Sequence, residues 1–328
     1  MRQRSLGLAV AGAMLCLAWA GPGLAAAQPP ASGHRVATLD IKILSTMLAD
    51  EGFGEWGFAA LVEVDGRKIL FDTGAHEDTV QRNLKILKED LANADTVILS
   101  HNHEDHTAGL ITLRRQYAPT SPKALSTVYT GHGIFWPRIG ANGQVDERMS
   151  RIKRDFEATG GTVADITKPT EILPGVWLTG PVPRVHPERN WSNLGKVRSD
   201  TGDLEDTVPE DMTLVFQTNQ GLVYLFGCGH AGVINTLTYT RKAIDPGPVK
   251  AIVGGLHLFG ASADQLKWTA DQFKTFGLQQ LVGAHCTGIE AVYRIRDLAG
   301  MTRQTCMVGA VGASYSLTKG INALRIAK

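Results

Sequence analysis

The stretch VILSHNHEDHTAGL, residues 97–110, places three histidines and two acids in six consecutive positions directly after an apolar run. His101 and His103 are two residues apart, and in extended backbone such residues project to the same side, so both imidazoles can reach one ion. Asp105 and His106 follow where the chain turns toward a helix, and they can face a neighbouring ion. Histidine and aspartate are good Zn²⁺ ligands, and an all-nitrogen and oxygen set leaves room for a bound water. The cluster therefore indicates a metal site that does chemistry, whereas closed structural zinc sites use mostly cysteine.

The elements around the cluster predict that it lies at the edge of a sheet. DTVILS, residues 95–100, predicts a short buried strand, and α/β proteins usually build their sites at the carboxyl ends of strands. FAALVEV and KILFDTG flank the turn sequence DGR and predict a hairpin. Apolar residues at helical spacing predict one helix over about 77–91 and another through 110–113.

The remaining chain alternates between irregular and ordered segments. Residues 119–210 are rich in proline, glycine and charge, and we predict loops there, including the charged run DERMSRIKRDFE. The second half predicts a hairpin of MTLVFQT and GLVYLFG, a helix over about 233–244, the strand KAIVGG, a helix over about 263–276 stopped by Gly277, the strand QLVGAH, a helix over about 289–299 and a last strand near 307–317. Strands that occur both in hairpins and between helices favour mixed sheets covered by helices, an α/β fold of the α+β type.

Composition bounds the class of protein and its partners. The chain has 328 residues, of which 20% are charged and 43% hydrophobic, as in a soluble globular protein. We find no linker between the halves, so residues 38–328 are predicted to form one domain. The net charge of +1 gives no basic excess for nucleic acid or a membrane surface. A small-molecule substrate is the expected partner.

The N-terminus has the pattern of a cleaved leader. Arg2 and Arg4 precede an apolar run over residues 6–20, and the three alanines at 25–27 form a cleavage site. Residues 1–27 are therefore predicted to be a signal peptide, and residues 28–37 a flexible N-terminus. We expect a periplasmic or secreted protein without a stable membrane span after leader removal; an uncleaved anchor is the alternative.

Three cysteines remain after the leader: Cys228, Cys286 and Cys306. An odd number in an oxidising compartment predicts no disulfide framework. Burial is the ordinary state of such thiols, and a place near a metal is the alternative.

The motif H-x-H-x-D-H after a short strand resembles the signature of the metallo-β-lactamase superfamily. LFDTG, ending near Asp72, is similar to the strand end that precedes this signature, and HAG at His230 and AHCTG at His285 stand where later metal-binding histidines are expected. The resemblance extends from about Leu39 to the C-terminus. GCGHAGVIN, GGLHLFGAS and AHCTG further resemble the subgroup of 7,8-dihydropterin-6-yl-methyl-4-(β-D-ribofuranosyl)aminobenzene 5'-phosphate synthases.

The resemblance implies an αββα sandwich of two mixed β-sheets flanked by helices, with two metal ions at its edge. It implies that one ion is held by His101, His103 and His230, and that the other is held by Asp105, His106 and His285. Asp72 would lie beneath them and orient a ligand. Zinc is the expected metal, while manganese or iron also suits histidine with carboxylate.

One position departs from the superfamily pattern. The family has an aspartate that bridges the two metals after the strand GLVYLFG, and this chain has Cys228 there. Either Cys228 bridges as a thiolate, or it is a small buried thiol and the bridge is lacking. His257 in GGLHL has two interpretations as well. It is either a packed core histidine or a site residue that binds the metal or contacts the substrate, and the subgroup resemblance favours the second.

Loop residues leave the substrate open among esters, lactones and phosphodiesters. Aromatic side chains in glycine- and proline-rich loops could form a ring-stacking pocket or cap a small loop core; they are Phe53, Trp56, Phe135, Trp136 and Trp191. Arginines in similar loops, which could meet an anionic group or simply be solvated, are Arg138, Arg184 and Arg198.

The expected function is an exported hydrolase in which a metal-bound hydroxide attacks an ester, lactone or phosphodiester bond, with Asp105 orienting the hydroxide. Two alternatives stay open. One is a metal-dependent transferase of the dihydropterin-linked synthase type, and the other is a non-catalytic metal- or ligand-binding protein on the same scaffold.

Overall fold

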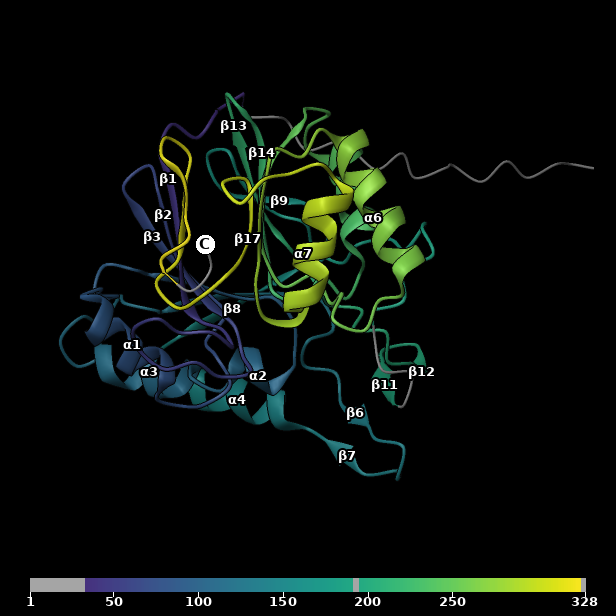
Figure 1. Ribbon diagram of the computed structural model, residues 1–328. Coiled ribbons are helices and arrows are strands. Elements are labelled where there is room, and N and C mark those ends of the chain that lie inside the picture. Colours follow the sequence, from purple (N-terminus) through teal and green to yellow (C-terminus); the bar gives the residue numbers. More distant parts are fainter. Residues whose placement is uncertain (1–32, 191–194, 326–328) are drawn as a thin grey trace, which may run out of the picture.

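Two mixed sheets form the centre of the fold in the computed structural model, which describes residues 33–190 and 195–325 (Figure 1). The first sheet has eight strands in the order β19-β18-β1-β2-β3-β4-β5-β8. Its strands are β1 Leu39–Ser45, β2 Ala59–Val64, β3 Arg67–Phe71, β4 Thr96–Leu99, β5 Thr127–Gly131, β8 Thr162–Ile166, β18 Ser314–Ser316 and β19 Gly320–Asn322.

The second sheet has seven strands in the order β17-β16-β15-β14-β13-β10-β9. Its strands are β9 Thr170–Leu173, β10 Val176–Leu178, β13 Leu214–Thr218, β14 Gly221–Phe226, β15 Val249–Gly254, β16 Gln280–Gly283 and β17 Cys306–Val308. The four strands from β14 to β17 are parallel neighbours, while β13 pairs with β14 in the predicted antiparallel hairpin.

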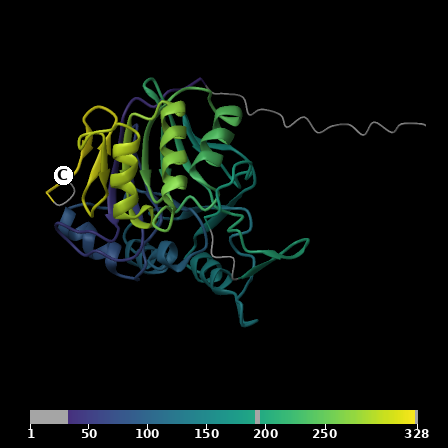
Figure 2. The same ribbon diagram turned by 45° about the vertical axis from the view of Figure 1, so that its right-hand side comes forward.

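Helices cover the outer face of each sheet. The first group is α1 Thr79–Leu87, α2 Glu104–Thr107, α3 Leu110–Tyr117 and α4 Arg148–Glu157, and the second is α5 Val233–Ala243, α6 Ala263–Phe276 and α7 Ile289–Leu298. Figure 2 shows α6 and α7 lying side by side against the second sheet. A smaller antiparallel sheet projects from this body and is built from β6 Arg138–Ile139, β7 Val145–Asp146, β11 Lys196–Ser199 and β12 Gly202–Glu205.

The side chains of β14 show why the strands are apolar throughout. Val223 and Leu225 belong to the core between the two sheets, whereas Leu222, Tyr224 and Phe226 belong to the core under α5, α6 and α7. A third core joins the first sheet to α1, α3 and α4. Three cores lie between four layers, which confirms the expected αββα sandwich. Because β14 is buried on both faces, it needs apolar residues at every position.

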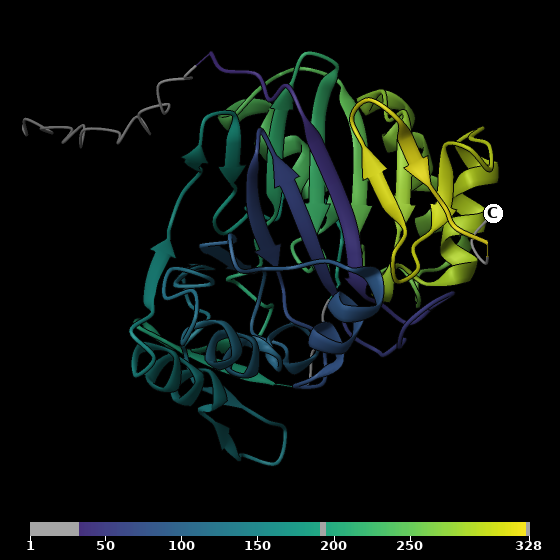
Figure 3. The same cartoon turned by 90° about the vertical axis from the view of Figure 1, so that its left-hand side faces the viewer.

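Two predictions about local structure were incomplete. Most of the segment 119–210 lies outside helices and strands, as expected, but it also supplies β5 and β8 to the first sheet, β9 and β10 to the second, and the helix α4 within its charged run. The single last strand near 307–317 is two strands, because the chain leaves the second sheet after β17 and crosses to the first sheet as β18. Figure 3 shows the yellow strand β18 beside the purple strand β1.

The predicted leader over residues 1–27 lies outside the described residues. Of the predicted flexible segment 28–37, residues 33–37 are described, and Val36 is buried and donates its N–H to the Gln217 carbonyl oxygen at 2.8 Å. Among the described helices, none combines the length and the apolar character that crossing a bilayer requires.

Candidate metal centre

Loops at the carboxyl ends of five strands meet at one edge of the sandwich. β3 and β4 run parallel in the first sheet, and β14, β15 and β16 run parallel in the second, so their carboxyl ends point the same way within each sheet. The loops after them carry, in chain order, Asp72, the stretch His101–His106, Cys228 with His230, His257 and His285.

The first predicted triad, His101, His103 and His230, comes together at this edge. One ring nitrogen of each residue lies within 4.8 Å of the others, and the Nε2 of His101 is 3.1 Å from the Nδ1 of His103. His101 and His230 are buried, whereas His103 is exposed, so the triad opens to solvent on the side of His103.

The second predicted triad, Asp105, His106 and His285, lies next to the first. The Nε2 atoms of His106 and His285 are 3.3 Å apart, and Asp105 Oδ2 is 3.3 Å from His285 Nε2. The ring centroids of His101 and His106 are 4.2 Å apart, which places the two triads in contact. The structure thus gathers all six predicted ligands into two adjacent sets of nitrogen and oxygen donors.

Asp72 holds the histidines of both triads through a buried network. Its Oδ1 accepts the backbone N–H of Ser100 at 2.7 Å, and its Oδ2 accepts the Ser100 hydroxyl at 2.8 Å. The same Oδ2 lies 2.7 Å from His106 Nδ1, while the Ser100 hydroxyl oxygen lies 2.9 Å from His101 Nδ1. With Nδ1 as the donor in each ring, both Nε2 atoms keep a lone pair directed at the centre.

A backbone carbonyl in the loop after β10 orients His230 in the same way. Its Nδ1 contacts the carbonyl oxygen of Asn190, whereas its Nε2 is buried and has no hydrogen-bond partner among the described residues. A buried, unpartnered ring nitrogen facing two other histidines is costly unless a cation is bound. The donor set therefore fits divalent metals.

The electrostatics of the triads suit cation binding. Burial and the neighbouring imidazoles hold the pKa values of His101 and His230 well below that of an ordinary histidine, so both rings are neutral at pH 7. Burial disfavours the charged form of Asp105, but the hydrogen bond from His285 and the nearby histidines outweigh it and lower the pKa of the carboxyl. Neutral imidazoles and an ionised carboxylate are the forms that bind metal.

Three residues at the centre have left-handed backbone conformations. Asp72, His257 and His285 have φ values of 54°, 50° and 47°, and each follows closely after a strand of one of the two sheets. Such conformations cost about 1–3 kcal/mol each and concentrate at functional sites, where surrounding structure enforces them.

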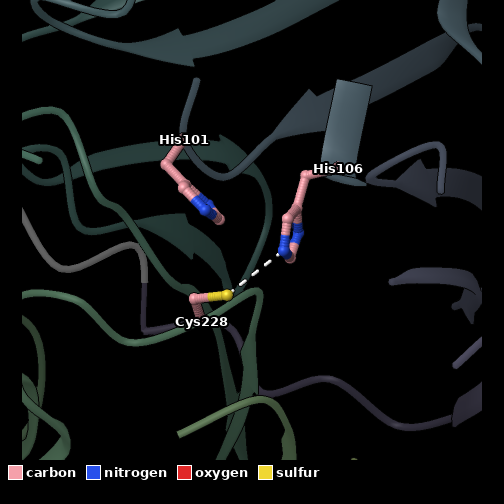
Figure 4. A group of neighbouring side chains, drawn as sticks. All are labelled: His101, His106 and Cys228. Atoms are coloured by element: carbon pink, nitrogen blue, oxygen red, sulfur yellow. Dashed lines mark hydrogen bonds between the residues drawn. The ribbon is translucent and has the colours of Figure 1, made fainter. Parts of the chain in front are cut away.

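Cys228 lies between the triads, at the position of the missing bridge. Its Sγ is 3.1 Å from His106 Nε2, and with His101 and His106 it forms another group whose ligand atoms lie within 4.8 Å (Figure 4). Burial raises the pKa of the free thiol well above the usual range. His257 lies at the same centre, with its ring 4.5 Å from that of His230, so the structure places it at the site rather than in the core.

Of the five aromatic residues predicted for a pocket, Trp56 lies at the centre. The residue is 50% exposed, and the centroid of its ring lies 4.9 Å from that of His285. Phe259, which the sequence analysis missed, is 58% exposed and packs edge-on against Trp56 at 5.8 Å. Arg82 covers the ring of Phe53, Phe135 and Trp136 pack against Lys153 and His132, and Trp191 lies outside the described residues.

The three predicted arginines contact protein groups. Arg138 forms ion pairs with Glu210 at 2.6 Å and Asp206 at 2.9 Å, and Arg198 pairs with Asp203 at 3.0 Å. Arg184 donates to the carbonyl oxygen of Thr207 at 2.5 Å. The ion pairs of Arg138 and Arg198 are made with acids outside the two triads.

Sequence reasoning missed residues that hold the histidine loop. Glu210 accepts the N–H of Asn102 at 3.1 Å, and Arg148 donates to the Thr107 hydroxyl at 2.7 Å. Arg148 also donates to the carbonyl oxygen of Asn102. Ser100 could have been found from the sequence, because it directly precedes His101. Arg148 and Glu210 could not, because only the tertiary fold brings them to the histidine loop.

Glu55 stabilises the segment that carries Trp56 by hydrogen bonds to two neighbouring segments. Its carboxylate accepts the Ser45 hydroxyl at 2.6 Å and the backbone N–H groups of Ala75 and His76 at 2.9 and 3.1 Å. Burial opposes ionisation, but these hydrogen bonds outweigh it and lower the pKa of Glu55. Glu55→Gln is therefore expected to lower the free energy of unfolding by about 1–3 kcal/mol at pH 7, because an amide group would face donors.

The measurement is urea unfolding of Glu55→Gln, with the exposed neighbour Glu77 changed to Gln as the control. The contribution of Glu55 is present above the ordinary pKa of 4.5 and is lost as the pH falls through the lowered pKa of the folded state, so the difference should shrink in acid. Equal stability of both variants at pH 7 would contradict this role.

Known proteins that resemble this chain belong to the family that the histidine motif indicates. Residues 57–187 match the family model of the metallo-beta-lactamase superfamily. The chain is 27% identical over 248 residues to the 7,8-dihydropterin-6-methyl-4-(beta-D-ribofuranosyl)-aminobenzene-5'-phosphate synthase of Methanocaldococcus jannaschii, an alignment covering 73% of this chain and 83% of that protein. Both resemblances inferred from the motifs are thus confirmed.

Solved structures show the same fold. Tm1679, described as a metal-dependent hydrolase of the beta-lactamase superfamily, superposes with a TM-score of 0.67 at 23% identity, covering 88% of this chain and all of that chain. The metallo-beta-lactamase fold protein YhfI from Bacillus subtilis superposes with a TM-score of 0.53 at 12% identity, covering 85% and 99% of the two chains. At these identities the likeness concerns the fold alone.

Proposed function

We propose that this chain, which has a metallo-β-lactamase fold and matches the superfamily model over residues 57–187, is a hydrolase that uses two divalent metal ions. The observation that carries the proposal is the contact between two complete sets of ligands, His101, His103 and His230 beside Asp105, His106 and His285. Zinc suits these donors best, and manganese or iron would also be accepted.

Two bound cations would supply Lewis acidity to the scissile group and lower the pKa of the attacking water. The protein itself provides the geometry. Asp105 is the partly exposed acid of the centre, with 24% of its side chain accessible, and its ionised carboxylate can accept a hydrogen bond from the attacking water. Trp56 and Phe259 are exposed beside the rings of His285 and His257 and can exclude bulk water from a bound substrate.

The bond cleaved is proposed to be an ester, a lactone or a phosphodiester. Each has a carbonyl or phosphoryl oxygen that two adjacent cations can polarise. Of the arginines predicted to meet an anionic group, Arg138 and Arg198 are already paired with acids, so these two do not single out the phosphodiester.

A second candidate is a metal-dependent transferase, and the synthase from Methanocaldococcus jannaschii favours it because the likeness covers most of both chains. The two reactions differ in the acceptor. Turnover in a mixture where water is the only acceptor supports the hydrolase, whereas turnover only after a second organic substrate is added supports the transferase.

The first experiment is the metal content of the protein purified without chelators, measured by inductively coupled plasma mass spectrometry. About two ions per chain are expected, and an ester, lactone and phosphodiester screen follows. About one ion per chain would mean that Cys228 in place of the bridging aspartate has cost the second ion. No metal and no rebinding would contradict the enzyme and leave the non-catalytic binding protein.

We further propose that residues 1–27 direct export and are removed, on the strength of Arg2, Arg4, the apolar run and the alanines at 25–27. The prediction is a periplasmic or secreted protein beginning at Gln28. Cell fractionation with intact-mass measurement tests it, and a full-length chain in the cytoplasm would contradict it.

A further inference from the structure

Two cysteines from different strands meet beside the triads. Cys228 follows β14 and Cys286 follows β16, and the two sulfur atoms are 3.2 Å apart. Both residues are buried, with exposed fractions of 2% and 1%. A disulfide bond is about 2.0 Å long, so the sulfurs need a further approach of only roughly 1 Å.

A glycine between the two loops makes this approach possible. Gly255 follows β15, the strand between β14 and β16. A Cβ atom at this position would lie 2.8 Å from the Cys286 sulfur and 2.2 Å from the Gly227 carbonyl oxygen. Only glycine therefore lets the loops of Cys228 and Cys286 pack this closely.

Cys228 also faces the metal ligands. Its sulfur is 3.1 Å from His106 Nε2 and 3.2 Å from the Cys286 sulfur, so one atom is available to either partner. A thiolate is a metal ligand, whereas a disulfide sulfur is a poor one. Bonding to Cys286 would thus withdraw the sulfur from the position between the triads.

We propose that Cys228 and Cys286 are an oxidation site at which a hydroperoxide forms a reversible disulfide, and that this disulfide weakens metal binding at the centre. The part concerning metal rests on the proposed function, whereas the disulfide itself does not. Because both sulfurs are buried, the oxidant must be small, and hydrogen peroxide is the simplest member of the class.

The reaction balances with one peroxide. The first thiol attacks the O–O bond, forming a sulfenic acid and releasing one water. The sulfur of the second thiol then forms the S–S bond and displaces the sulfenic oxygen, which leaves as a second water with the remaining proton. The two cysteines lose two electrons, and the two peroxide oxygens gain them.

The test treats the full chain with one equivalent of hydrogen peroxide, blocks free thiols and maps tryptic peptides. Cys228 lies in peptide 199–241 and Cys286 in peptide 275–294, so a disulfide joins these two peptides. We expect the joined peptides to appear with peroxide and to separate with dithiothreitol. Bound metal should fall with the first treatment and return with the second, when metal is supplied again.

Two variants sharpen the outcome. Cys286→Ser should give no joined peptide and leave Cys228 to oxidise further, so dithiothreitol should no longer restore metal binding. The control is Cys306→Ser, because Cys306 is buried elsewhere and contacts the Val292 carbonyl oxygen at 3.6 Å. It should behave as the unmodified protein does.

Unjoined peptides after peroxide would overturn the oxidation site, and joined peptides with unchanged metal content would overturn its effect on the centre. A protein that binds no metal before oxidation contradicts the proposed function instead, and the peptide map still decides whether the disulfide forms.

Discussion

Replacing Asp105 by alanine is expected to lower the bound metal from about two ions per chain to about one and to abolish turnover. Asp105 is the carboxylate of the second triad, where its Oδ2 lies 3.3 Å from His285 Nε2 and 3.9 Å from His106 Nε2. Its removal leaves His106 and His285 without the carboxylate charge that balances a divalent cation. The first triad contains no atom of Asp105 and should keep its ion.

The matched control is Glu104→Ala, which removes an exposed acid one residue away that belongs to neither triad. Metal content and hydrolysis of the substrate found by screening are measured on both variants. His103→Ala should cause the complementary loss at the first triad, with His132→Ala as its control. Full activity of Asp105→Ala or His103→Ala would refute the two-metal scheme.

The second large effect is expected from Asp72→Asn. Asp72 is fully buried and accepts two hydrogen bonds from Ser100 as well as the contact from His106 Nδ1. An asparagine would present an amide N–H group to some of these donors and would leave His106 without its charge partner. Metal affinity should fall by about 10–100-fold, and breaking the buried pair should cost about 3–5 kcal/mol of folding stability.

The pH dependence of the folding stability of the metal-free protein distinguishes loss of the Asp72–His106 pair from a general loss of packing. Burial opposes protonation of His106, but Asp72 outweighs it and raises the pKa of His106 to about 9. The pair therefore stabilises the fold fully below the ordinary pKa of 6.5, and this stabilisation is lost as the pH rises through about 9. Denaturant titrations should show this loss in the unmodified protein and not in Asp72→Asn; parallel curves would contradict the role.

The sequence predicts most of the elements that carry the centre. The strand before His101, both hairpins and the helix over 263–276 ending at Gly277 are as expected, because continuous apolar runs and clear helical spacing leave few alternatives. The six ligands were assigned by family resemblance, and the structure brings them together. Their binding of metal remains a prediction.

The features that the sequence did not predict have either a weak sequence pattern or contacts between distant segments. In α4, Met149, Ile152 and Phe156 have helical spacing, but surrounding charges obscured it, and so the helix was missed. The meeting of Trp56 with Phe259 is set by how the two sheets pack, which no local pattern in either loop reveals.

The crossing of the chain from β17 to β18 has a consequence for biosynthesis. β1 pairs with β2 on one side and with β18 on the other, so strands from opposite ends of the described chain are neighbours. Pairings between such distant segments form slowly. While the ribosome is still making the second half, one edge of β1 has no partner strand to bond, and that edge is where a chaperone would protect the nascent protein from aggregating.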